Sequence, residues 1–224
     1  MDGSYVASLV QQRGHCMTEI QRKPAPDTYP WILVGLLWMV SFLNAADRSI
    51  LNSVKPLLRD AFDITDIQLG MMDTTFFWTY AVCAFVFGRV GDSVRRRNMI
   101  IFGLIFWSMA TGIMPFATGF AMLLGMRTLV AIGESTYYPT ATALISAWHK
   151  PSMRSRALSI HQTAVFAGGG IGGWVAGKLA DSYGWPAPFI IFAALGFVAI
   201  AILFKLLRDD APGEVRVSEE KRAE

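Results

Sequence analysis

The sequence predicts an all-α membrane protein that crosses the bilayer six times. Of its 224 residues 53% are apolar, its mean hydropathy is positive, and its charged residues lie almost wholly outside six long apolar blocks. A soluble domain of this size would scatter its apolar residues. About 20 predominantly apolar residues cross the hydrocarbon core as a helix. The blocks long enough to do so are 31–54, 69–90, 98–117, 119–148, 155–180 and 186–207.

Polar segments flank this predicted bundle, which we place at residues 30–207. Residues 1–29 contain no apolar core of useful length for a signal peptide, so we expect a cytoplasmic tail and an uncleaved first helix. Residues 208–224 are charged and include an Ala-Pro-Gly sequence, which predicts a cytoplasmic linker or a truncated tail.

Two local patterns define helix boundaries. Thr65-Asp66-Ile67-Gln68 has the pattern of a capping box that opens the second helix. The connection at residues 115–118 is so short that the third and fourth helices are expected to be adjacent and antiparallel.

The basic residues predict the orientation. Counted over the tail, the connections and the final segment, fifteen Lys and Arg residues lie on one side of the predicted membrane and three on the other. Short loops rich in Lys and Arg stay cytoplasmic, so both termini are expected in the cytoplasm, with the chain in the plasma (inner) membrane. The basic residues flank hydrophobic spans rather than interleave with exposed aromatics, which argues against nucleic-acid binding.

Enzymatic chemistry has no recognisable signature in the sequence. There is no cluster with metal-ligand spacing, no nucleophile–base pair and no phosphate-binding glycine loop after a strand. Cys16 and Cys83 lack a CxxC arrangement, and we expect two unpaired thiols. We therefore expect no metal, no cofactor and no enzyme.

The connection between the second and third blocks, residues 88–100, combines two glycines beside Asp92 with an arginine triplet that follows it. It resembles the signature loop between helices 2 and 3 of the major facilitator superfamily, Gly-x-Leu-Ala-Asp-Arg-x-Gly-Arg-Lys/Arg-x-x-Ile. Ser93 and Arg95 depart from that pattern. The matching positions are Gly88, Asp92, Arg96, Arg97 and Ile100. The resemblance implies that the first four of them form a conformational gate, and we expect Asp92 to hold the cytoplasmic side closed.

A sequence pattern that occurs twice in the chain supports the same family. The Gly88-x-Val-Gly-Asp92 pattern at the end of the second helix recurs at residues 177–181 at the end of the fifth, without the arginine triplet. This is expected of a 3+3 inverted repeat, whose substrate site lies at the repeat interface near mid-membrane. The chain therefore resembles the N-terminal six-helix half of a major facilitator that works by alternating access.

Away from the ends of the predicted spans lie Asp47 and Arg48 in the first helix, and Arg127 and Glu134 on one face of the fourth. Each charge at mid-bilayer costs at least about 2.5–3.5 kcal/mol, so it needs a partner or a water-filled cavity. One interpretation is that Asp47–Arg127 and Arg48–Glu134 merely neutralise each other across a packed interface.

The other interpretation is functional. Arginine offers a planar, always-charged group for a substrate carboxylate, and proton coupling needs a buried carboxyl group that can load and release a proton near neutral pH. Asp47 or Glu134 fits that second task. Asp73 and Tyr80, seven residues apart in the second helix, could line the same cavity.

The same residues carry a narrower resemblance. Residues 44–48, Asn-Ala-Ala-Asp-Arg, resemble the Asn-Tyr-x-Asp-Arg stretch of the anion:cation symporter family, which handles sugar acids and related organic anions. Residues 127–134 are similar to its helix 4 pattern, Arg-x-x-x-Gly-x-Gly-Glu. The resemblance implies that Arg48 contacts the anion and that Asp47 and Glu134 couple protons. Spinster-type lipid carriers show similar stretches and are the second candidate family. The substrate-binding set we predict is Arg48, Asn44, Arg127, Tyr137 and Gln162.

The sequence thus predicts half of a transporter for a small organic anion and H+, working in the lipid bilayer with a second six-helix half or as a homodimer. The alternative is a non-transporting fragment or a membrane interaction subunit. Two further alternatives stay open. His161 is either a structural hydrogen-bonding residue or a proton relay, and the glycine-rich face at residues 168–177 either permits close helix packing or forms a hinge.

Overall fold

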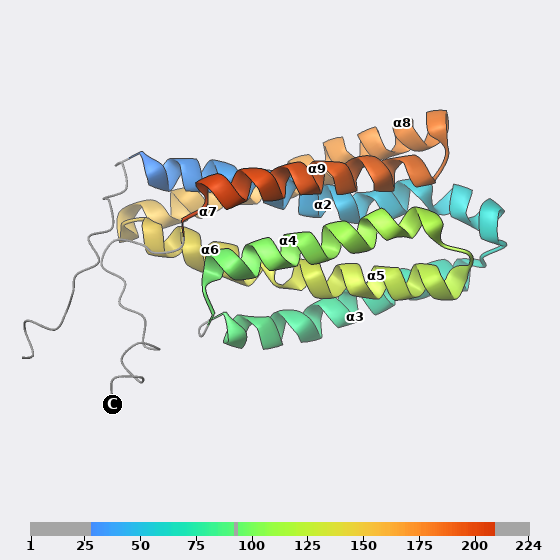
Figure 1. Ribbon diagram of the computed structural model, residues 1–224, viewed down its shortest axis with the longest axis horizontal. Helices are drawn as coiled ribbons and strands as arrows, with labels where there is room; N and C mark the ends of the chain where they lie inside the picture. The colour runs from blue at the N-terminus through green and yellow to red at the C-terminus, as the bar shows by residue number, and fades with distance from the viewer. Residues whose placement is uncertain (1–27, 92–93, 209–224) are drawn as a thin grey trace, which may run out of the picture.

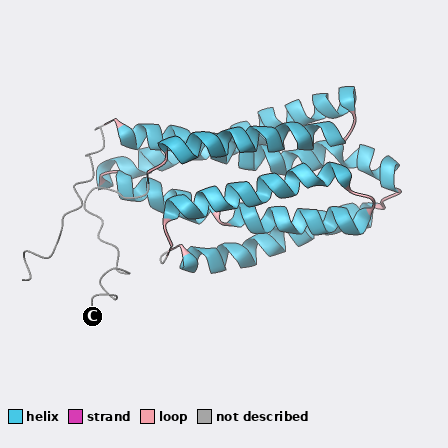
Figure 2. Cartoon of the chain, viewed as in Figure 1, coloured by secondary structure: helices cyan, strands magenta, loops and turns pink. Residues whose placement is uncertain are grey.

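The structure, a computed structural model, describes residues 28–91 and 94–208, which form a bundle of helices aligned with its long axis (Figure 1). Within these ranges no strand occurs, so the predicted all-α class is confirmed (Figure 2). Asp92, residues 1–27 of the predicted N-terminal tail and residues 209–224 of the predicted linker lie outside the described residues.

The helices follow one another with short connections. They are α2 (Tyr29–Phe62), α3 (Asp66–Val90), α4 (Arg96–Ile113), α5 (Phe120–Ser135), α6 (Tyr137–Trp148), α7 (Pro151–Ala167), α8 (Gly173–Tyr183) and α9 (Pro186–Leu206), with a 3-10 turn η1 (Met114–Phe116) and a π-helical segment η2 (Gly168–Gly172). Four of them, α2, α3, α4 extended by η1, and α9, are long and apolar enough on their own to cross a membrane.

The first helix is longer than predicted. We expected it to end at Val54, where the apolar block ends, but α2 continues through Pro56 to Phe62. Lys55, counted as a loop residue, lies on the helix and pairs with Asp73 of α3, with Nζ 2.5 Å from Oδ2. Arg59, one turn further along α2, pairs with Asp66 at the start of α3. The extra helical turns therefore carry ion pairs in addition to the apolar contacts of Leu58 and Phe62.

The capping box at the start of α3 is confirmed. The backbone N–H of Gln68 donates to Thr65 Oγ1 at 3.3 Å, and the Thr65 N–H donates to Gln68 Oε1 at 2.9 Å. Two otherwise unpaired backbone donors of the first turn are satisfied in this way.

Both of the predicted later spans, 119–148 and 155–180, are interrupted. The first is divided into α5 and α6 at Thr136, because Pro139 has no N–H to donate to the carbonyl of Ser135. The Thr136 hydroxyl turns back and donates to the Gly133 carbonyl at 2.9 Å. The second begins at Pro151 and contains η2 between α7 and α8, a bulge of the kind that often marks a functional segment.

Glycines set the closest helix contacts. A Cβ at Gly133 of α5 would lie 2.8 Å from the backbone nitrogen of Trp107 on α4, and one at Gly172 would collide with Ala46 of α2. The helices α4 and α5 therefore lie side by side, as their short connection predicted (Figure 1). The contacts of η2 with α2 support close packing as one role of the glycine-rich face.

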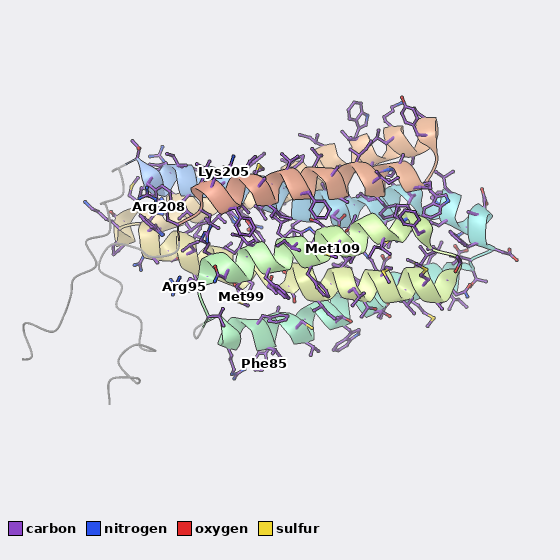
Figure 3. All side chains as sticks on the ribbon, viewed as in Figure 1. Phe85, Arg95, Met99, Met109, Lys205 and Arg208 are labelled. Carbon is purple, nitrogen blue, oxygen red and sulfur yellow. The ribbon has the colours of Figure 1, made fainter. Side chains whose placement is uncertain are left out.

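The helix α3 packs on α5 rather than on α2, its neighbour in sequence. Its outward face carries large exposed apolar side chains, among them Phe77, Trp78 and Phe85. Figure 3 shows Phe85 pointing away from the other helices. An apolar surface of this extent on a bundle of long apolar helices is typical of a protein in a membrane.

Candidate functional site

A buried ion pair joins α2 to α5. Arg48 Nε donates to Glu134 Oε2 at 2.6 Å, across 86 residues of sequence. The Glu134 side chain is 0% exposed, whereas the Arg48 side chain is 30% exposed. The pair therefore links a fully buried carboxylate to a cation that reaches the surface of the bundle.

Aromatic rings of α3 flank both arginines of the site. The Arg48 Cζ lies 4.5 Å from the ring centroid of Tyr80 and 5.4 Å from that of Phe76. The Arg127 Cζ lies 4.0 Å from the Phe76 centroid, and Phe76 itself is fully buried. These distances are within the range of cation–π attraction. One buried ring thus contacts two guanidinium groups and fixes how they lie.

Asp47 is buried and faces α4. Its two carboxylate oxygens accept from the Thr111 hydroxyl at 3.2 and 3.0 Å, and it interacts electrostatically with Arg127 and Glu134. Among hydrogen bonds and ion pairs of the described residues, its partner is Thr111 and not Arg127, whose guanidinium turns toward Phe76. Asp47 and Arg127, which we considered as a pair from the sequence, therefore interact electrostatically but form no ion pair among the described residues.

Three polar atoms in and beside this cluster are buried without a hydrogen-bond partner. They are Arg127 Nε, Glu134 Oε1 and Asn44 Nδ2. Buried polar groups in native structures are nearly always paired, so two unused donors and one unused acceptor indicate a place where a ligand or water completes the bonding. Of the mutual neutralisation considered from the sequence, the Arg48–Glu134 pair forms, while Arg127 Nε and Asn44 Nδ2 keep a donor without a partner.

Tyr137 and Gln162 belong to a different group of contacts. The Tyr137 hydroxyl donates to the Leu37 carbonyl at 2.5 Å, so the 2.8 Å contact with His161 Nε2 requires the histidine to donate. His161 therefore has a hydrogen-bonding role between α6 and α7. Gln162 Oε1 accepts from the Tyr138 hydroxyl at 3.2 Å.

Three of the predicted gate residues are described in the structure, and they lie beside two different helices. Gly88 and Arg96 line a small cavity with Pro139 and Thr140 of α6. Arg97 donates from Nε to the Leu207 carbonyl and from Nη2 to the Phe204 carbonyl, both at 2.7 Å, and so caps the end of α9.

Sequence reasoning missed Phe76 and Thr111. Neither has a charge or a motif that would have singled it out within an apolar block. The only available signal for Phe76 is its spacing of four from Tyr80, which places both rings on one face of α3.

Known proteins resemble this chain in sequence and in structure. The sequence model of the Major Facilitator Superfamily matches residues 37–224. "Protein spinster homolog 1" of Homo sapiens is 35% identical over 187 residues, which are 82% of this chain and 35% of that protein. The hexuronate transporter of Bacillus subtilis is 25% identical over 198 residues, 88% of this chain and 46% of that protein.

A solved structure shares the arrangement of helices. The crystal structure of a bacterial homolog of the human lysosomal transporter spinster, inward-facing and occupied, matches with a TM-score of 0.78 and 25% identity over 88% of this chain and 48% of that one. The chain spans between about a third and a half of the length of these relatives.

Proposed function

This chain belongs to the Major Facilitator Superfamily, and we propose that it is the N-terminal six-helix half of a secondary transporter that couples uptake of a small organic anion to protons by alternating access. The observation that carries the proposal is the Arg48–Glu134 pair, because its two members differ so much in exposure. The fully buried carboxylate depends on the arginine, whereas the arginine can be reached from outside.

The pair supplies a mechanism for coupling. Protonation of Glu134 removes the negative charge that holds Arg48 and leaves an uncompensated cation, which favours binding of an anion from the cavity. Release of the proton restores the pair and expels the anion. Arg127, which is buried against Phe76, provides a second fixed positive charge for the substrate. Asp47 serves as a further proton site beside Thr111.

The interrupted helices support a transporter site at this depth. We assign α5 and α6 to one membrane span and α7, η2 and α8 to another, which gives six spans arranged as a 3+3 inverted repeat. Irregular helical backbone is tolerated in membranes where it is buried in protein or lines a cavity, and discontinuous helices form substrate sites in transporters. The α5–α6 break at Thr136 adjoins Glu134 and Tyr137.

The orientation and the gate also belong to the proposal. The excess of basic residues favours cytoplasmic termini in the plasma (inner) membrane. Gly88, Asp92, Arg96 and Arg97 would form the cytoplasmic gate, with Arg97 tying α4 to the end of α9. Asp92→Asn should change the labelling of cysteine probes on the cytoplasmic side, and unchanged labelling would argue against the gate.

The experiment is uptake into proteoliposomes that hold this chain, alone or with a second six-helix half encoded beside it. A panel of sugar acids and carboxylates is offered with and without an inward proton gradient, and the gradient should accelerate uptake. Arg48→Gln should weaken apparent affinity about 10- to 150-fold, the range for a lost hydrogen bond to a charged group. Arg59→Gln, the same change on the same helix, is the control and should retain uptake.

Two results would count against the proposal. Normal uptake by Arg48→Gln would refute the anion site. Uptake at the same rate with and without the proton gradient would refute proton coupling. The alternative function, left open by the sequence, is a non-transporting fragment or an interaction subunit. It predicts no uptake by the chain in any combination, including as a homodimer.

A further inference from the structure

One end of the bundle brings together aromatic and basic side chains that the proposed transport cycle does not use. The start of α2, the junction of α6 and α7 and the end of α9 all lie at this end (Figure 1). The rings of Tyr29 and Trp148 lie 4.6 Å apart, and those of Trp31 and His149 lie 5.2 Å apart. We call these four residues the end cluster.

Two arginines lie against the end cluster. Arg154 Nε donates to the His149 carbonyl at 3.1 Å, which leaves its terminal nitrogens for other partners. The Arg208 Cζ lies 5.3 Å from the Tyr29 ring, and the Arg208 backbone N–H donates to the Tyr29 hydroxyl at 2.6 Å. Figure 3 shows Arg208 and Lys205 at this end of the molecule. Backbone contacts thus hold both cations beside the aromatic rings.

Two buried polar atoms of the end cluster have no partner. Trp148 Nε1 and His149 Nε2 make no hydrogen bond, although the residues are only 8% and 6% exposed. His149 Nδ1 lies 2.8 Å from the Ile145 carbonyl and so must donate to it, which leaves Nε2 as an acceptor in the neutral ring. An unpaired buried donor costs about 1–3 kcal/mol. An acceptor-bearing ligand that reached the Trp148 indole N–H would remove that cost.

The charge around the end cluster has one sign in the described part of the chain. Lys150, Arg154, Lys205 and Arg208 are exposed there. The described carboxylates lie in the interior or in the helices and turns of the opposite half: Asp47, Glu134, Asp60, Asp63, Asp66, Asp73 and Asp181. Asp27, Asp209 and Asp210 stand nearby in sequence, outside the described residues. The surface that the structure describes therefore favours an anion.

We propose that the end cluster, Arg154 and Arg208 bind the phosphate of an anionic phospholipid. Tyr and Trp side chains at the ends of apolar helices lie at headgroup level, so the ligand that meets them is a lipid rather than a soluble anion. The Trp148 indole N–H donates to a headgroup oxygen, and the two arginines supply charge-assisted bonds. The site is independent of Arg48 and Glu134, so it stands or falls separately from the proposed transport.

The test is native mass spectrometry of the full chain, released from micelles that contain phosphatidylglycerol or phosphatidylcholine. The wild-type chain should retain phosphatidylglycerol in preference. Arg154→Gln should weaken retention more than about tenfold, as expected for a lost charge-assisted bond. Arg156→Gln is the matched control: Arg156 lies on the same helix two residues away, hence on the opposite face. Arg156→Gln should weaken retention of phosphatidylglycerol at most about fivefold, which is the contribution of one basic residue near an anionic surface.

Trp148→Phe provides a second variant, because it keeps the ring that contacts Tyr29 and removes only the N–H donor. It should also weaken retention of phosphatidylglycerol and leave that of phosphatidylcholine unchanged. Equal retention of the two lipids, equal effects of Arg154→Gln and Arg156→Gln, or an unaffected Trp148→Phe variant would each overturn the site. Displacement of the lipid by millimolar inorganic phosphate would overturn the lipid as its occupant.

Discussion

Breaking the Arg48–Glu134 pair should lower the free energy of unfolding by an amount that depends on which partner is replaced. Arg48→Gln leaves a carboxylate that is 0% exposed, whereas Glu134→Gln leaves a cation that is 30% exposed and contacts the rings of Phe76 and Tyr80. Removal of one partner of a buried pair costs about 3–5 kcal/mol. Arg127 still interacts with Glu134 in the Arg48 variant, so we expect about 3 kcal/mol for Arg48→Gln. We expect a smaller cost for Glu134→Gln.

The measurement is thermal unfolding of the detergent-solubilised chain. At about 2–4 °C per kcal/mol for a protein of this size, Arg48→Gln should lower the Tm by about 6–12 °C. The double variant Arg48→Gln/Glu134→Gln removes both charges and should recover part of that loss. A double-mutant cycle should therefore give a coupling energy within the range of about 0.5–3 kcal/mol seen for residues in contact.

Two outcomes would refute this reasoning. Additive effects of the two substitutions would mean that the residues do not interact in the protein. A Glu134→Gln variant less stable than Arg48→Gln would mean that the difference in exposure does not decide the cost. Arg59→Gln serves as the control, because Arg59 forms an exposed ion pair with Asp66 and should change the free energy of unfolding by at most about 1 kcal/mol.

Other substitutions test the packing around the site. Phe76→Ala should lower the free energy of unfolding by about 3–5 kcal/mol, while Phe77→Ala, at an exposed neighbouring ring, should change it by less than about 0.5 kcal/mol; similar losses would argue against the buried position of Phe76. Gly172→Ala should destabilise by about 1–3 kcal/mol because the new methyl group meets α2. Gly170→Ala, which meets nothing within 4 Å, should be neutral or stabilising in the same unfolding assay. Arg97→Gln should speed amide hydrogen exchange in the last turn of α9, whose carbonyls it caps, and unchanged exchange there would contradict that role.

Family membership and fold class could be recognised from the sequence because both depend on local patterns. The signature loop after α3 and the charged positions of α2 and α5 occur at fixed spacings that need no tertiary information. The superfamily predicted from them is confirmed, and the relatives include both predicted kinds, a hexuronate transporter and spinster proteins. The proton-coupling roles of Asp47 and Glu134 stay predictions.

Helix ends were less predictable. Hydropathy reports where a segment stops being apolar, which need not be where its hydrogen bonding stops. For that reason α2 outlasts its apolar block by two turns, and the α5–α6 break at Thr136 was missed inside a continuous apolar block. The polar residues Lys55 and Arg59 stay helical because α3 brings carboxylates to them.

By itself, the sequence determined that this chain is a bundle of apolar helices with four ionisable groups that cannot remain unpaired in lipid. Which groups meet was decided only by the tertiary structure. Glu134 could have faced either arginine, and packing of α5 between α3 and α4 turned its carboxylate to Arg48. The same packing left Asp47 with Thr111 and set Phe76 against both arginines, because contacts between distant segments depend on how helix surfaces fit and not on spacing along the chain.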